Sequence, residues 1–202
     1  MNAILETAAG NPENEDRGAV MESSAGLVLV VADGAGGRSG GAEAATMAVE
    51  FLRQNASLIN SADSCAQLLS RMDAAIANDS TAGETACAFV VASPSRLIGA
   101  SVGDSGVWLI PESGAFLDLT RGQQRKPFIG SGAAWPVPFE HPNPKGSLLL
   151  ATDGLLKYTS AERIIAVCRE QPAETAAQRL IELVRYQSGA LPDDVTLILC
   201  KL

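Results

Sequence analysis

Apolar residues recur along the chain in short runs, and their spacing alternates between that of strands and that of helices. Residues 27–32 are six apolar residues without a polar interruption, rich in valine, which is typical of a strand buried on both faces. Helical spacing of apolar residues follows over residues 41–55 and again over residues 64–77. These three segments predict a buried strand followed by two helices that each pack one face against a sheet.

Further strands and helices follow from the same pattern. Two more helices are predicted over residues 160–170 and 173–188. The other predicted strands cover residues 3–7, 19–21, 85–92, 97–102, 107–110, 116–119, 147–151 and 195–200. Strands and helices are grouped rather than alternating, which excludes a doubly wound parallel fold. The pattern favours an α+β class, with two mainly antiparallel sheets flanked by helix pairs, and 202 residues suit a single domain, residues 1–202.

The segment 120–146 stands apart because it is rich in proline and has few apolar periods. We expect it to be an irregular loop that covers a site. It contains the single histidine of the chain, His141, which we interpret as a loop residue rather than a catalytic base.

Charge and cysteine content exclude several functions. The net charge of −8 disfavours nucleic acid or an anionic membrane as a partner. No apolar run is long enough to span a bilayer, and the first residues do not resemble a signal peptide, so a cytoplasmic protein is expected. The four cysteines are far apart and form no CxxC pair, which indicates buried free thiols rather than a zinc site.

Aspartates stand at the ends of several predicted strands or in tight turns. They are Asp16, Asp33, Asp104, Asp153 and Asp193. Clustered carboxylates repel one another unless cations neutralise them, and oxygen-only ligands suit magnesium or manganese. Two such ions can activate a water and clamp a phosphoryl group, so a phosphate hydrolase is one hypothesis. The alternative is a set of unrelated turn residues, because aspartate is common in turns.

The motifs that contain these aspartates occur in a recognisable order. They are Asn14-Glu15-Asp16, Val31-Ala32-Asp33-Gly34-Ala35-Gly36-Gly37, Gly83-Glu84-Thr85-Ala86, Val102-Gly103-Asp104-Ser105, Ala151-Thr152-Asp153-Gly154-Leu155 and Asp193-Asp194-Val195-Thr196. Each motif is weak alone, but in this order they resemble the metal-dependent serine/threonine phosphatases of the protein phosphatase 2C family. The resemblance covers the chain from about residue 9 to its end. The chain is most similar in kind to the small bacterial stand-alone members.

The resemblance implies an α-β-β-α sandwich with two Mg²⁺ or Mn²⁺ ions at one end of the sheets. Asp33 would bridge both ions, and the Gly34 carbonyl would complete one coordination shell. Asp153 and Asp193 would bind the second ion. Asp104, with Asp153, matches the position of a third ion.

The resemblance also implies roles around the ions. Glu15 and Asp16 would hold metal-bound waters, and a water bridging the two ions would attack phosphorus directly. Asp194 occupies a position where many relatives have asparagine, so we expect it to support the ligands.

Three departures from the family pattern concern substrate binding. Asn11 stands where the family usually has an arginine that binds the substrate phosphate, and a neutral amide cannot pair with its charge. We therefore hypothesise that Arg17 or Arg38 substitutes for it. Ala35 stands where animal members have a histidine proposed as general acid. The segment 120–135 is also shorter than the usual flap.

The resemblance implies a phosphoprotein substrate, such as a kinase target or a regulator of a sigma factor. Arg121, Arg125 and Lys126 would steer it to the cleft, or would simply form a solvated basic loop. Two other functions stay open. A phosphoprotein-binding module without turnover is favoured by the missing arginine, although the intact acidic positions oppose it. A small-molecule phosphatase is favoured by the short flap.

Overall fold

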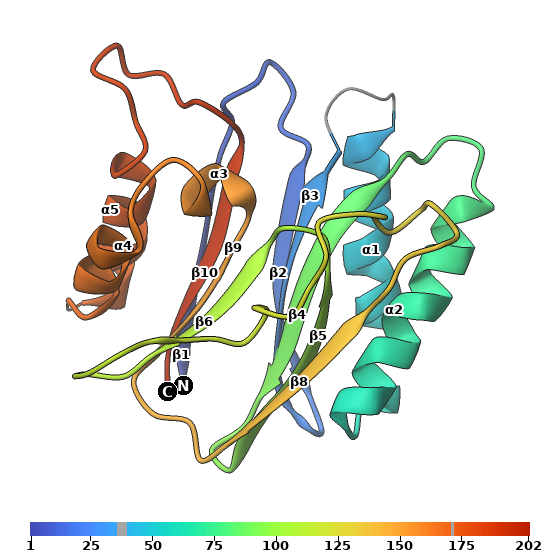
Figure 1. Ribbon diagram of the computed structural model, residues 1–202, viewed down its shortest axis with the longest axis horizontal. Coiled ribbons are helices and arrows are strands. Elements are labelled where there is room, and N and C mark those ends of the chain that lie inside the picture. The colour runs from blue at the N-terminus through green and yellow to red at the C-terminus, as the bar shows by residue number, and fades with distance from the viewer. Residues whose placement is uncertain (36–39, 171) are drawn as a thin grey trace.

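Two stacked β-sheets form the centre of the molecule, and helices cover both outer faces. The computed structural model describes residues 1–35, 40–170 and 172–202, and in these ranges each sheet has five strands. Helices α1 (Gly41–Asn55) and α2 (Ala62–Ala77) cover one sheet, and α4 (Ala161–Cys168) and α5 (Ala173–Glu182) cover the other (Figure 1). The prediction of an α+β sandwich of antiparallel sheets flanked by helix pairs is confirmed.

The first sheet has the strand order β2-β3-β4-β5-β8. Its strands are β2 (Asp16–Ser23), β3 (Gly26–Gly34), β4 (Thr85–Ala92), β5 (Arg96–Val102) and β8 (Val137–Pro142). All neighbouring strands are antiparallel, and the β2–β3 register places Asp16 directly opposite Asp33. The β2–β3 hairpin therefore brings two of the candidate acids together.

The second sheet has the strand order β1-β10-β9-β6-β7. Its strands are β1 (Asn2–Ala8), β10 (Val195–Lys201), β9 (Ser147–Ala151), β6 (Gly106–Ile110) and the short β7 (Leu117–Asp118). Ala151 at the end of β9 pairs with Gly106 at the start of β6 and with Leu197 of β10. The chain segments that contain Asp104, Asp153 and Asp193 therefore lie at the same end of this sheet.

The uninterrupted apolar run in β3 is explained by burial on both faces. Val28 and Val30 pack in the layer beneath α1 and α2, whereas Leu29 and Val31 pack between the two sheets. A third apolar layer lies between the second sheet and helices α4 and α5. Because β3 lies in the interior of the sandwich, the carboxylate of Asp33 at its end is held by a rigid element.

Some predictions need correction. Residues 120–146 are not irregular throughout, because Val137–Pro142 forms β8 on the edge of the first sheet. Prolines are tolerated on an edge strand, where one side of the backbone needs no partner. His141 therefore belongs to a strand, opposite Leu97, and not to a loop. The last helix ends at Glu182 rather than at residue 188.

Smaller features complete the fold. A single turn of helix, α3 (Asp153–Leu156), follows β9, and a 3₁₀ turn, η1 (Ala56–Leu58), follows α1. The four cysteines are buried and unpaired, as predicted. Within the described ranges, no helix combines the length and the apolar character that crossing a bilayer requires.

Candidate metal centre

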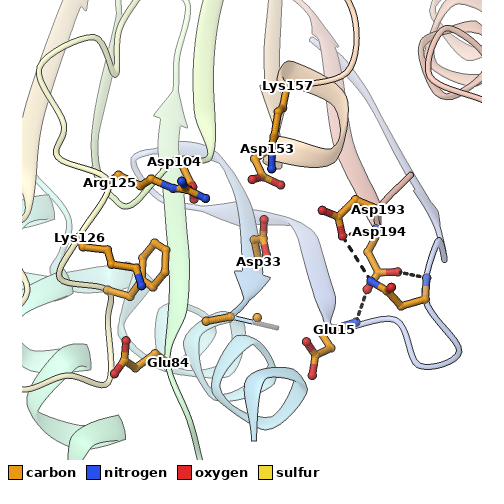
Figure 2. A pocket seen from close by; sticks show the side chains of 14 residues that line it. Glu15, Asp33, Glu84, Asp104, Arg125, Lys126, Asp153, Lys157, Asp193 and Asp194 are labelled. Atoms are coloured by element: carbon orange, nitrogen blue, oxygen red, sulfur yellow. Dashed lines mark hydrogen bonds and ion pairs between the residues drawn. The ribbon is translucent and has the colours of Figure 1, made fainter. Parts of the chain in front are cut away.

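A cavity of about 550 Å³ opens at the end of the sandwich where β3, β9 and the β5–β6 turn come together. Its lining combines acidic and basic side chains. The acids are Glu15, Asp33, Glu84, Asp104, Asp153, Asp193 and Asp194, and the bases are Arg125, Lys126 and Lys157. Figure 2 shows Asp33 and Asp153 near the centre, with Asp104 and Arg125 on one side and the Asp193–Asp194 pair on the other.

Three aspartates, which we call the acidic floor, form the centre of this cavity. Asp33 ends β3, Asp104 lies in the turn between β5 and β6, and Asp153 follows β9. One carboxylate oxygen from each lies within 4.8 Å of the other two. Both sheets contribute to the floor, so the stacking of the sheets sets its geometry.

Asp16 lies beneath this floor and does not line the cavity. It sits opposite Asp33 in the β2–β3 pair, and its side chain is buried. The Thr152 hydroxyl donates a hydrogen bond of 2.8 Å to Asp16 Oδ2. Thr152 directly precedes Asp153, so this contact joins the first sheet to the second under the floor.

A second group, which we call the acidic wall, consists of Glu15, Asp193 and Asp194. Asp194 organises the wall through three backbone N–H groups. Its Oδ1 accepts hydrogen bonds from the amides of Gly10 (2.8 Å) and Asn11 (3.0 Å), and its Oδ2 accepts one from the amide of Glu15 (2.9 Å). Asp194 thus ties the loop before β2 to the start of β10.

Two glycines allow neighbouring backbone segments to pack closely beside the acidic floor. A Cβ atom at Gly154 would lie 1.9 Å from the backbone oxygen of Asp194. A Cβ atom at Gly34 would lie 2.5 Å from the backbone carbonyl carbon of Gly41 at the start of α1. Only glycine fits at such distances. The Asp-Gly pairs of the sequence are therefore explained by the close backbone packing beside each aspartate.

Burial and mutual repulsion make this cluster costly to charge. Burial, and then the carboxylates of Asp16 and Asp153, raise the pKa of Asp33. Burial also raises the pKa of Asp16, although the hydrogen bond from Thr152 opposes this effect. For Asp153, burial and the nearby Asp104 raise the pKa. Bound divalent cations would relieve the repulsion, and a set of carboxylate oxygens suits hard ions such as Mg²⁺ or Mn²⁺.

Comparison with known proteins identifies the family. Residues 7–185 match the model of the family described as Protein phosphatase 2C. The chain belongs to the protein phosphatase 2C family. The members of this family are serine/threonine phosphatases, which are hydrolases, and the resemblance seen in the sequence motifs is confirmed. The search of curated proteins gave no match.

Solved structures share the fold over nearly the full length. A bacterial serine phosphatase has a TM-score of 0.85 and 19% identity, with 98% of this chain and 96% of that chain covered. Stp1 from Staphylococcus aureus has a TM-score of 0.82 and 19% identity, with coverages of 99% and 94%. The catalytic domain of PstP, solved in complex with two manganese ions, has a TM-score of 0.79 and 22% identity, with coverages of 98% and 96%.

The basic residues that line the cavity form a third group, which we call the basic side. They are Arg125, Lys126 and Lys157. Arg125 Nε donates a hydrogen bond of 2.7 Å to Asp104 Oδ2. Lys126, from the same loop, and Lys157, at the end of α3, also line the cavity. The sequence drew attention to Arg125 and Lys126 but not to Lys157. The missed signal is its spacing of four residues from Asp153, which places both on one side of a helical turn.

Of the residues expected to bind the substrate phosphate, Asn11 lies at the cavity and Arg17 does not. Asn11 lines the cavity, and its side-chain amide donates to Asp193 Oδ1 (3.3 Å). The Arg17 guanidinium instead donates to Thr46 Oγ1 and to the backbone oxygens of Asn14 and Asp16, and Arg17 does not line the cavity. Arg38, the other candidate, lies outside the described residues.

Proposed function

We propose that this chain hydrolyses phosphoserine and phosphothreonine in proteins with the help of Mg²⁺ or Mn²⁺ ions held in the cavity. The observation that carries the proposal is the convergence of Asp33, Asp104 and Asp153 from separate strand ends. Their oxygen-only donor set fits hard divalent ions. The match to the phosphatase family gives the class of reaction that such a site would perform.

Asp33, the Gly34 carbonyl, Asp153 and Asp193 are the proposed ligands of two ions, and Asp104 is the proposed ligand of a third. When bound, the ions would supply an activated water and neutralise charge on the phosphoryl group.

Other residues shape and orient the site. Asp16 would fix the position of the floor from below through its hydrogen bond with Thr152. Glu15 lines the cavity, where its carboxylate would accept a hydrogen bond from water. Asp33 and Gly34 hold their places because they end a strand buried on both faces.

The substrate is proposed to be a phosphoprotein, such as a kinase target or a regulator of a sigma factor. A phosphorylated side chain brings about two negative charges into a cavity rich in carboxylates. Bound cations and the basic residues Arg125, Lys126 and Lys157 would offset this repulsion.

The test measures manganese-dependent hydrolysis of a phosphothreonine peptide and of para-nitrophenyl phosphate. Asp33→Asn and Asp153→Asn are expected to lower turnover about a hundredfold or more, because each removes a charge proposed to bind an ion. Asp63→Asn is the matched control, since Asp63 is an exposed aspartate in the first turn of α2. A chelator should abolish the activity of the wild-type protein.

Other results would favour the alternatives. Manganese binding without hydrolysis of either substrate would favour a phosphoprotein-binding module. Hydrolysis of para-nitrophenyl phosphate but of no phosphopeptide would favour a small-molecule phosphatase. Hydrolysis that persists in chelator and in both variants would contradict the proposed role of the ions.

A further inference from the structure

Many carboxylates line the cavity. Among the residues that the structure describes, Arg125 is the only arginine that lines it. The amide of Asn11 is hydrogen-bonded to Asp193, and the Arg17 guanidinium is hydrogen-bonded to backbone oxygens away from the cavity. A planar guanidinium can bind two phosphate oxygens at once, which neither an amide nor an ammonium group can do.

We propose that Arg125 binds the phosphoryl group of the substrate and so takes the part that a neutral Asn11 cannot play. This inference rests on the proposed phosphatase function and names one of the residues that recognise its substrate. It also departs from the hypothesis that the sequence suggested, in which Arg17 or Arg38 had this role.

The position of Arg125 suits this role. Its Nε is hydrogen-bonded to Asp104, a member of the acidic floor, so the guanidinium lies beside the site where a phosphoryl group would meet the ions. Figure 2 shows the Arg125 side chain extending toward Asp104 from the edge of the cavity. The side chain is 68% exposed, and Nε alone contacts Asp104. The two terminal nitrogens remain available for an anion that enters from solvent.

The loop that presents Arg125, residues 119–136 between β7 and β8, is anchored on both sides of this residue. Before it, the Gln123 side chain donates to the Ser105 backbone oxygen (2.7 Å). After it, Ile129 and Thr85 exchange backbone hydrogen bonds of 2.9 and 3.0 Å. A loop that is already ordered loses little entropy when its side chain binds a ligand.

Asp73 of α2 adds the strongest anchor of this loop. Its Oδ1 accepts hydrogen bonds from the amides of Gly130 (2.8 Å) and Gly132 (3.0 Å), and its Oδ2 accepts one from the amide of Ala134 (3.0 Å). Asp73 is 5% exposed, so these bonds are shielded from water. The loop beyond Arg125 is therefore attached to the same helix that covers the first sheet.

Asp104 links phosphate recognition to cation binding. Its carboxylate now pairs with Arg125, and a cation bound at the floor would draw on the charge of the same carboxylate. Loading the floor with cations therefore weakens the hold of Asp104 on Arg125 and leaves the guanidinium free to pair with a phosphoryl group. Phosphate recognition by Arg125 is thus strongest in the metal-loaded protein.

The experiment is a calorimetric titration of inorganic phosphate into the manganese-loaded protein, for the wild type and three variants. Arg125→Ala is expected to weaken phosphate binding about tenfold to a hundredfold, the usual loss for a charge-assisted hydrogen bond. Arg125→Lys keeps the charge but not the planar guanidinium, so its phosphate affinity should lie between those of the wild type and Arg125→Ala. Arg163→Ala removes an exposed arginine of α4 that does not line the cavity, and should match the wild type.

Two further readouts separate this role from a structural one. Manganese affinity should not fall in Arg125→Ala, because the variant removes a competitor for Asp104 rather than a ligand. The Michaelis constant for para-nitrophenyl phosphate should rise in proportion to the loss of phosphate affinity. Circular dichroism checks that the variant is folded.

Failure of this inference is distinguishable from failure of the proposed function. An active wild type whose phosphate affinity and Michaelis constant are unchanged in Arg125→Ala would overturn the role of Arg125 alone. An inactive wild type whose phosphate affinity still depends on Arg125 would overturn the hydrolase and support the inference. A manganese-loaded wild type that binds no phosphate would also overturn the inference.

Discussion

The acidic side and the basic side of the cavity are built in different ways. The acidic floor and wall stand at the ends of paired strands, and strand register and close glycine packing hold them in place. The basic side is carried largely by the β7–β8 loop, which a few side-chain hydrogen bonds attach to its neighbours. This difference matches the proposed division of roles, in which the strand ends would hold the metal ions and the loop would bind the phosphoryl group of the substrate.

The largest expected effect comes from breaking the acidic wall with Asp194→Ala. This change leaves the backbone amides of Gly10, Asn11 and Glu15 without their side-chain acceptor. We expect a loss of about 3 kcal/mol or more in the free energy of unfolding, and a loss of about a hundredfold in activity. Urea unfolding and manganese-dependent hydrolysis measure the two effects.

Asp194→Asn is the matched comparison for that change. Its amide oxygen can still accept from Gly10 and Asn11, but its NH₂ group cannot accept from Glu15. The loss should therefore be clearly smaller than in Asp194→Ala. Equal losses in the two variants would show that the hydrogen bonds are not what holds the wall.

A smaller effect is expected from loosening the loop with Asp73→Asn. The NH₂ group of asparagine cannot accept from the Ala134 amide, so one anchor of the loop is lost. We expect the Michaelis constant to rise about tenfold, with manganese affinity unchanged, because the floor is built separately. Asp63→Asn, on the same helix, is the control. A fall in manganese affinity in Asp73→Asn would contradict the separation of the two sides.

The acidic side should also give the metal-free protein an unusual pH dependence. Burial and neighbouring carboxylates raise the pKa of Asp33, Asp16 and Asp153 above the ordinary value of 3.8. Between pH 3.8 and the raised pKa values, the folded chain therefore binds more protons than the unfolded chain. The free energy of unfolding consequently falls as the pH rises through this range. The melting temperature of the metal-free protein should be about 5 °C higher at about pH 6 than at about pH 8.

Manganese provides the check on this explanation. Its addition at about pH 8 should restore the lost stability, because bound ions neutralise the same carboxylates. In Asp33→Asn the pH dependence should be weaker, since one of the repelling charges is gone. A melting temperature that rises with pH in the metal-free protein would contradict the account.

The smallest expected effect is that of Lys157→Ala. Lys157 lowers the pKa of Asp153, although burial and Asp104 outweigh it, and it lies on the basic side without belonging to the β7–β8 loop. We expect a change of about threefold in the Michaelis constant, less than for Arg125→Ala. A loss in Lys157→Ala that exceeds the loss in Arg125→Ala would assign phosphate recognition to the lysine.

The acidic side was largely predictable from the sequence, because it follows local rules. A buried apolar run that ends in Asp33-Gly34, and a similar run that ends in Asp153-Gly154, mark the floor, and the motif order gave the family. The register that sets Asp16 opposite Asp33 was not predicted, because the predicted strand began at residue 19 whereas β2 begins at Asp16. The residues alone left open a set of unrelated turn aspartates, and it was the resemblance to the family that implied one shared site.

How the basic side is held in place could not be predicted, because the residues that anchor it lie far from it in the sequence. Asp73 is one acid in an amphipathic helix, and nothing local indicates that its partners lie 57 to 61 residues further along the chain. Because of its prolines, Val137–Pro142 was not predicted to form an edge strand. The contact of Arg125 with Asp104 depends on how the loop folds back over the floor. Such contacts are set by tertiary structure rather than by local pattern.

The most direct test of the central claim is a calorimetric titration of Mn²⁺ into the metal-free protein at about pH 7.5. The account predicts at least two binding sites in the wild type, with the tightest binding lost in Asp33→Asn and retained in Asp63→Asn. A wild-type protein that binds no manganese, or an Asp33→Asn variant that binds it as tightly as the wild type, would contradict the proposed metal centre.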